Sequence, residues 1–114
     1  MEKEDILSGL ILEIRRGTIV LSVLSKLEKP MYGYSLVSEL SDSGISVEAN
    51  TLYPLLRRLE SQGLLESEWE TSGSKPRKYY NTTKMGCEIQ EKLKKNWLET
   101  VDSMEKLWRE SNEK

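Results

Sequence analysis

The stretch SVEANTLYPLLRRLESQGLLESEWETSGSKPRKYYN, residues 46–81, decides the fold because its hydrophobic period changes along its length. Its leucines first recur every three or four positions, which predicts an amphipathic helix. From Leu64 to Glu70 the side chains alternate, with glutamates at every second position. This period of two predicts a strand with its glutamates on one face. A polar turn then leads into a second strand from Arg77 to Asn81. We therefore expect a helix and a β-hairpin, with an inner helix face of Leu52, Leu55, Leu56 and Leu59.

The start of this helix has two alternatives. Ser46 is a favourable N-cap residue, but a helix starting there contains Pro54. Pro54 would remove the hydrogen bond to the carbonyl of Asn50, a defect that costs ~3 kcal/mol unless the helix bends. Thr51 as the N-cap would avoid that cost. At the other end, near residue 62, Gly63 stands where a left-handed residue is favoured.

Three further helices flank this stretch. Apolar spacing predicts one helix over residues 6–27, ended by Pro30, and a short one over 32–40, stopped by the polar run at 41–44. A last helix opens near Thr83 and runs to about Glu110. The order helix, helix, turn, helix, hairpin predicts a winged helix-turn-helix, mainly α with a small β-hairpin (α+β). We assign residues 1–82 to the DNA-binding domain and residues 83–114 to a C-terminal dimerisation helix.

The hairpin should lean on the helices, because an isolated hairpin is marginally stable. Tyr79 and Tyr80 are expected to pack it there, and Trp69 is expected to be a packing residue of the hairpin.

The two long terminal helices carry more apolar surface than one chain can cover. The stripe of the last helix is seven turns long, and the ~80 residues before it must first pack on each other. We therefore expect a homodimer held by the terminal helices. The residues expected in its interface are Leu7, Leu10, Ile11, Leu93, Trp97, Val101, Met104 and Trp108.

Charge is unevenly distributed. The chain has 17 basic and 19 acidic residues, a net charge of -2, so it is not basic as a whole. Residues 75–84 nevertheless hold four cations and no acid, which predicts a phosphate-binding wing. The polar residues that open the third helix could reach phosphates or base edges. The predicted DNA-binding residues are Asn50, Thr51, Tyr53, Arg57, Lys75, Arg77 and Lys78.

Several function classes are excluded by composition. The chain has no His and a single Cys, Cys87, which removes Cys/His zinc sites, Ser-His-Asp triads and Cys-His dyads. The Glu and Asp residues form no recognisable catalytic pair, so we expect neither an enzyme nor a cofactor or metal. No window resembles a membrane span and the start lacks a signal-peptide layout, so we expect a cytoplasmic protein without membrane contact.

Three segments also resemble a known family. GTIVLSVLSKLEKPMYGYSLVSEL at 17–40, ANTLYPLLRRLESQGLLESEW at 49–69 and KPRKYYNTTKMG at 75–86 resemble the PadR family of bacterial transcriptional regulators, in its order and spacing. The single long helix after Gly86 is similar to the shorter subgroup, whose members dimerise through their terminal helices. The resemblance places the recognition helix at 48–62. Thr82 departs from the family pattern, which usually has an apolar residue there, and puts the packing of the hairpin base in doubt.

The resemblance implies a homodimeric repressor that binds a pseudo-palindromic DNA operator with one recognition helix per half-site. It also implies a small aromatic effector, which could stack between the two copies of Trp97 in the dimer seam. The alternative is a winged-helix protein-protein interaction module that does not bind DNA. The acidic total charge and the row of Glu66, Glu68 and Glu70 favour that alternative.

Overall fold

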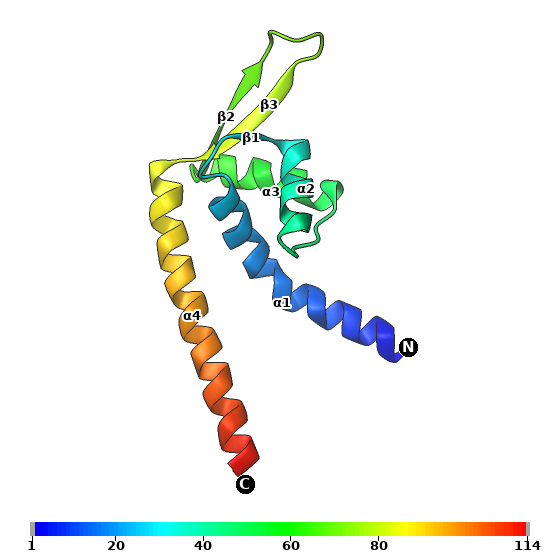
Figure 1. The fold of residues 1–114 in the computed structure, drawn as a ribbon, viewed down its shortest axis with the longest axis vertical. Coiled ribbons are helices and arrows are strands. Elements are labelled where there is room, and N and C mark those ends of the chain that lie inside the picture. Colours follow the sequence, from blue (N-terminus) through cyan, green and yellow to red (C-terminus); the bar gives the residue numbers. More distant parts are fainter. Residues whose placement is uncertain (1, 114) are drawn as a thin grey trace.

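The computed structural model describes residues 2–113, so the outermost residues of the two predicted domains, 1 and 114, lie outside it. All predicted helices and both hairpin strands form, with small shifts at their ends (Figure 1). The elements are α1 (Lys3–Lys26), β1 (Met31–Tyr32), α2 (Gly33–Asp42), α3 (Ala49–Ser61), β2 (Leu65–Glu70), β3 (Arg77–Thr82) and α4 (Lys84–Glu113).

Helix α3, the recognition helix that the family resemblance implies, starts at neither of the two residues that propensity favours. Glu48 occupies the N-cap position through its backbone alone, and its carbonyl accepts the N–H groups of Thr51 at 3.0 Å and Leu52 at 2.9 Å. Pro54 lies inside the helix. The physical reason is burial, since Leu52 joins the leucines of the following turns in the core only if the helix forms on both sides of Pro54. The start expected from the family resemblance, near residue 48, is confirmed.

The predicted left-handed glycine after α3 is confirmed. Gly63 has a φ of 80°, its N–H donates to Glu60 at 3.0 Å, and the N–H of Leu64 donates to Leu59 at 2.9 Å. This pair of bonds satisfies the last carbonyls of the helix and turns the chain directly into β2. Gly44 ends α2 with the same geometry, at a φ of 87°.

The sheet has three strands, whereas the sequence predicts a two-stranded hairpin. The added strand β1 pairs antiparallel with β3, with Met31 opposite Tyr80 and Tyr32 opposite Tyr79, so the strand order is β1-β3-β2. Its two residues are too few to show a period of two, and α2 begins at the next residue. Because β1 leads directly into α2, the wing is joined by hydrogen bonds to the helix-turn-helix.

The hydrophobic core lies where the C-terminal half of α1 meets α2, α3 and the base of the sheet. Tyr80 is buried, as predicted, and Tyr79 is half-buried. The prediction that Trp69 is a packing residue is wrong: 62% of it is exposed, because it is the second-last residue of β2, near the hairpin tip and away from the base of the sheet. The buried residues are Val23, Leu24, Leu27, Leu36, Leu40, Leu52, Leu56, Leu59, Leu65 and Tyr80.

Thr82 fits the base of the hairpin by hydrogen bonding. It is 7% exposed; its hydroxyl donates to the carbonyl of Leu24 at 2.9 Å, and its N–H donates to that of Leu27 at 2.7 Å. Both carbonyls belong to the end of α1, where a helix leaves acceptors without intrahelical donors. The polar side chain that departs from the family pattern therefore ties the wing to α1.

The chain is extended because its terminal helices diverge. In Figure 1 the N-terminal half of α1 and most of α4 leave the packed body in different directions. The radius of gyration is 17.2 Å, whereas a compact chain of this length has one of about 13 Å. Among the described residues, the large side chains left exposed on these two helices are Ile6, Leu7, Leu10, Leu12, Ile14, Met85, Leu93, Trp97, Leu98, Met104, Leu107 and Trp108.

Candidate nucleic-acid interface

An open groove of about 390 Å³ lies between the recognition helix and the wing. Its walls come from the start of α2, from α3 and from the two hairpin strands, and they carry five aromatic side chains and three cations. The lining residues are Tyr32, Gly33, Tyr34, Tyr53, Arg57, Trp69, Pro76, Arg77, Lys78 and Tyr80. Aromatic rings interleaved with cations suit a phosphodiester backbone with sugars and bases beside it.

On the α3 wall, the groove contains two of the four predicted DNA-binding residues of that helix. Arg57 is exposed and Tyr53 is half-buried against the start of α2. Asn50 and Thr51 are exposed on the first turn of α3, outside the lining of this groove. Thr51 instead borders a second hollow, between α1 and α3, whose rim carries Arg16 and Arg58.

On the wing wall, Arg77 lies against two tyrosine rings. The rings of Tyr32 and Tyr34 are stacked, 5.7 Å between centroids and 5° from parallel. The guanidinium carbon of Arg77 is 5.6 Å from the centroid of Tyr32 and 6.0 Å from that of Tyr34. Its Nη1 also donates to the hydroxyl of Tyr34 at 3.4 Å. These distances fit cation–π contacts and restrict the side chain.

Lys78 occupies a different environment. Its Nζ is 3.4 Å from Oε1 of Glu60 on α3, and 5.3 Å and 5.9 Å from the ring centroids of Tyr80 and Trp69. Ser67 donates its hydroxyl to the other oxygen of Glu60. This cluster joins the end of the recognition helix to both strands of the wing. Lys75, the third predicted wing cation, is exposed in the loop at the hairpin tip.

The acidic row on β2 is engaged by neighbouring residues. Glu66 accepts a hydrogen bond from Asn81 at 3.2 Å, and Glu68 accepts one from the hydroxyl of Tyr79 at 3.0 Å. The hydrogen bond to Glu68, together with its negative charge, raises the pKa of Tyr79 above its usual value.

Glu70, the third acid of that row, accepts from Ser72 twice, through the hydroxyl and through the N–H at 2.9 Å. The hydrogen bond from the Ser72 hydroxyl makes the larger contribution and the one from the N–H the smaller. Both lower the pKa of Glu70 and so favour the charged carboxylate. Each acid of the row that favours a protein-binding module thus has one oxygen engaged within the hairpin.

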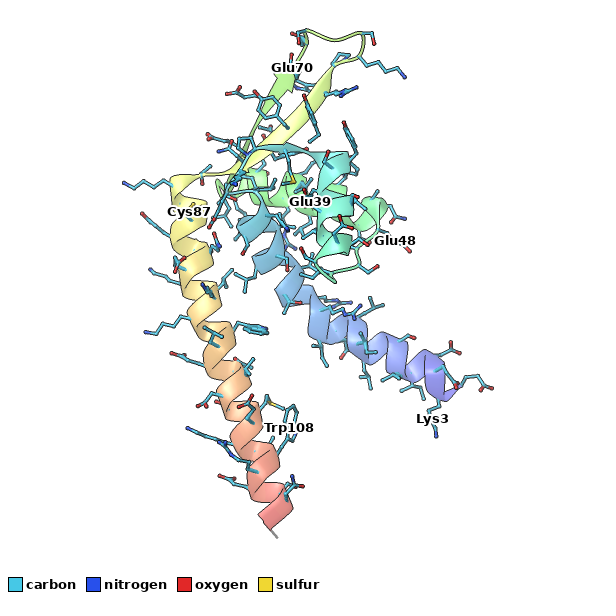
Figure 2. All side chains as sticks on the ribbon, viewed as in Figure 1. Lys3, Glu39, Glu48, Glu70, Cys87 and Trp108 are labelled. Carbon is cyan, nitrogen blue, oxygen red and sulfur yellow. The ribbon has the colours of Figure 1, made fainter. Side chains whose placement is uncertain are left out.

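The predicted dimer residues lie on the diverging parts of the terminal helices. Ile11 and Val101 are half-buried, and the other six are exposed; 45% of Trp97, for example, is accessible. Figure 2 shows Trp108 near the free end of α4, remote from the packed body. Among residues 2–113, no helix is long and apolar enough to cross a membrane, and no group of three or more acidic, Cys or His side chains could hold a metal ion.

Sequence reasoning missed four contributors to this surface: Tyr32, Tyr34, Trp69 and Glu60. The two tyrosines reach the groove only because β1 pairs with β3, and Glu60, which does not line the groove, reaches Lys78 because α3 packs beside the hairpin. Tyr32, Gly33 and Tyr34 are part of a segment that resembles the family. The sequence alone, however, does not predict that the two tyrosine rings contact Arg77.

Two helices joined by a turn, with a recognition helix followed by a hairpin wing, define a winged helix-turn-helix protein. Residues 20–95 match the family described as the Transcriptional regulator PadR-like family. The chain therefore belongs to the PadR-like family of transcriptional regulators, which are not enzymes.

Known relatives agree with this assignment. A PadR family transcriptional regulator from Eggerthella lenta, solved by crystallography, is 57% identical, covers 91% of this chain and 93% of its own, and superposes with a TM-score of 0.86. The transcriptional regulator Rv3488 of Mycobacterium tuberculosis is 37% identical over 75 residues, 65% of this chain and 70% of its own. Bacillus subtilis PadR, solved in complex with operator DNA, shares the fold at 24% identity and a TM-score of 0.61, over 74% of this chain and 48% of its own.

Proposed function

We propose that this protein is a homodimeric repressor that binds a pseudo-palindromic operator through the groove between α3 and the wing. The observation that carries the proposal is the arrangement of Arg57 on one wall of that groove and of Arg77 and Lys78 on the other. A duplex strand seated there would meet cations from both elements. Bacillus subtilis PadR, which has the same fold, was solved with operator DNA, and this supports the choice of ligand. An operator-binding role also implies a cytoplasmic location.

The contacts we propose have two roles. The exposed first turn of α3 would enter the major groove, where its side chains could read base edges, while the wing cations would bind phosphates. The first group is Asn50, Thr51 and Tyr53. The second group comes from the wing, where the cations are Lys75, Arg77 and Lys78 and not all of them need contact a phosphate directly, and Arg57 lies between the two groups.

The second copy would dock on the exposed stripes of α1 and α4. Large contiguous apolar surface on a small domain marks an interaction site, and two self-complementary stripes suit a two-fold dimer. This gives residues 1–82 the DNA contacts and residues 83–114 the dimerisation helix, with α1 completing the dimer seam. The interface would include Leu7, Leu10, Ile11, Leu93, Trp97, Val101, Met104 and Trp108. Two-fold symmetry would space the half-sites by one turn of B-DNA, about 34–36 Å, or a multiple of it.

We further propose that a small planar aromatic effector binds in the seam beside Trp97 and lowers operator affinity. Trp97 is an exposed aromatic ring on the stripe, and two symmetry-related copies could stack on a flat ligand. Quenching of tryptophan fluorescence by phenolic acids in the wild type but not in Trp97→Phe would support this role. Equal quenching in both would remove Trp97 from the site.

The DNA-binding function is tested by measuring affinity for duplex DNA from upstream of the protein's own gene at increasing salt. Replacing Lys75, Arg77 and Lys78 with Ala should weaken binding and flatten the slope of log affinity against log salt, by ~0.9 for each phosphate that the variant no longer neutralises. A matched control replaces Lys92, Lys95 and Lys106 with Ala, which removes the same charge from exposed positions of α4. Equal behaviour of the two triple variants would favour the protein-protein interaction module.

A further inference from the structure

We propose that the wing cations are not equivalent: Arg77 is the phosphate anchor, Tyr34 with Tyr32 positions it, and Lys78 is retained by Glu60 in the joint between wing and recognition helix. The proposal rests on the DNA-binding function above and deepens it. It distinguishes the wing cations by their role in DNA binding, whereas in the sequence they form a single basic run.

The guanidinium of Arg77 is confined by its neighbours in β1 and at the start of α2. Two stacked rings and a hydroxyl restrict its guanidinium, with the centroids at 5.6 and 6.0 Å and the Tyr34 oxygen at 3.4 Å. A cation held in place before binding loses less conformational freedom when it contacts a phosphate. A guanidinium lying over rings still has N–H groups at its edge, and these match the oxygens of a phosphate.

Arg77 also has no carboxylate partner within the described part of the chain. The residue opposite it in the strand register is Glu70, which would be the natural acid to neutralise it. Oε1 of Glu70 instead accepts hydrogen bonds from the hydroxyl and the N–H of Ser72. Among residues 2–113, no acidic oxygen lies within 4.0 Å of the Arg77 guanidinium. The positive charge of Arg77 is therefore available to DNA, whereas Glu70 is held by the turn.

Lys78 shows the opposite arrangement. It is paired with Glu60, and both side chains are partly buried, with exposures of 30% and 33%. Moving the ammonium to a phosphate would leave the Glu60 carboxylate facing the DNA with its partner removed. The pair bridges α3 and β3, and Ser67 adds a bond from β2 to the same carboxylate. Lys78 is thus placed to fix the angle of the wing relative to the recognition helix.

Arg77 also lies across the groove from the recognition helix. Arg77 and Tyr34 border the same groove as Arg57 of α3, so one strand passing through the groove would meet a cation on each wall. Tyr34 is 57% exposed, and its ring is supported by Tyr32. It can therefore be replaced without opening the core, which makes it the better probe of positioning.

The test measures operator affinity as a function of salt for single and double variants. Arg77→Ala should lower the salt slope by ~0.9 per chain, about 1.8 for a dimer, whereas Lys78→Ala should lower the thermal midpoint and leave the slope unchanged. Tyr34→Leu should weaken binding, and Tyr34→Phe, which keeps the ring, should weaken it less. In the Arg77→Ala background, Tyr34→Leu should have no further effect, because a positioning residue acts only through the side chain that it positions.

Each contrary result has a distinct meaning. Failure of the wild type to retard any duplex in dilute salt would overturn the DNA-binding function and this proposal with it. Wild-type binding combined with an unchanged slope in Arg77→Ala, or an equal reduction of the slope in Lys78→Ala, would overturn the ranking alone. Additive effects of Tyr34→Leu and Arg77→Ala would make Tyr34 an independent DNA contact. Circular dichroism of each variant shows that the fold is retained.

Discussion

The ring of Tyr53 on the recognition helix lies directly against Gly33 at the start of α2, where a Cβ on Gly33 would stand 2.7 Å from Cε1 of the ring. The hydroxyl of Tyr53 would be 3.2 Å from the same Cβ. The glycine of the YGY segment thus makes room for a side chain of α3. Because Tyr53 lines the groove with Tyr34 and Arg77, this contact sets the shape of the DNA-facing surface.

Gly33→Ala should therefore push the tip of Tyr53 into the groove. We expect weaker operator binding and a decrease in stability of about 1–3 kcal/mol, as for other overpacked sites. Affinity titrations and urea unfolding measure the two effects. Ser38→Ala, on the exposed face of α2, is the matched control and should change neither. Full operator affinity in Gly33→Ala would mean that the position of Tyr53 has no influence on binding.

Met104→Glu should convert the dimer to monomers. Met104 lies on the exposed apolar stripe of α4, and burying a carboxylate there without a partner is costly. Sedimentation equilibrium should report the mass of one chain for this variant. Lys95→Glu, nine residues earlier and so on the opposite side of the helix, changes the charge more and should remain a dimer. A wild-type mass of one chain at micromolar concentration would rule out the proposed homodimer.

Thr82→Val should destabilise the fold by about 1–3 kcal/mol, because the buried carbonyl of Leu24 loses the hydroxyl that donates to it. The change in volume is small, so the effect reports the hydrogen bond and not a cavity. Thr82→Ser keeps the hydroxyl and should be destabilised less. If chemical denaturation ranks Val above Ser in stability, the hydroxyl does not hold the wing to α1, and the backbone bond to Leu27 and packing do.

Tyr79 should titrate above the usual tyrosine pKa of about 10. Its pKa is raised because the hydroxyl donates to Glu68 and because ionisation would place a negative charge beside that carboxylate. The neutral form is the one favoured in the folded chain, so this contribution to stability is present below about pH 10 and disappears as the pH rises through the raised pKa. Glu68→Gln should shift the tyrosinate absorbance of Tyr79 to lower pH, and Tyr79→Phe identifies its part of the signal. Superimposable titrations of the wild type and Glu68→Gln would show that the hydrogen bond is absent in solution.

Much of the fold could be predicted because its information is local. The change of period at residue 64, the left-handed position of Gly63 and the stop at Pro30 depend on near neighbours in the chain, and each is confirmed. Family resemblance supplied the start of α3, which propensity misplaced. That start depends on the burial of Leu52 against residues that are distant in the sequence, which a local pattern does not show.

The sequence by itself determined the order of the elements, the basic run of the wing and the apolar stripes of α1 and α4, since periodicity and charge are properties of a linear pattern. Tertiary structure alone decided which partner each wing cation meets. Pairing of β1 with β3 places Tyr32 opposite Tyr79 and so brings the rings of Tyr32 and Tyr34 to Arg77. Packing of α3 beside the hairpin brings Glu60 to Lys78. Arg77 and Lys78 both border the groove, but they are successive residues of one strand, so their side chains leave the strand in opposite directions and meet different partners.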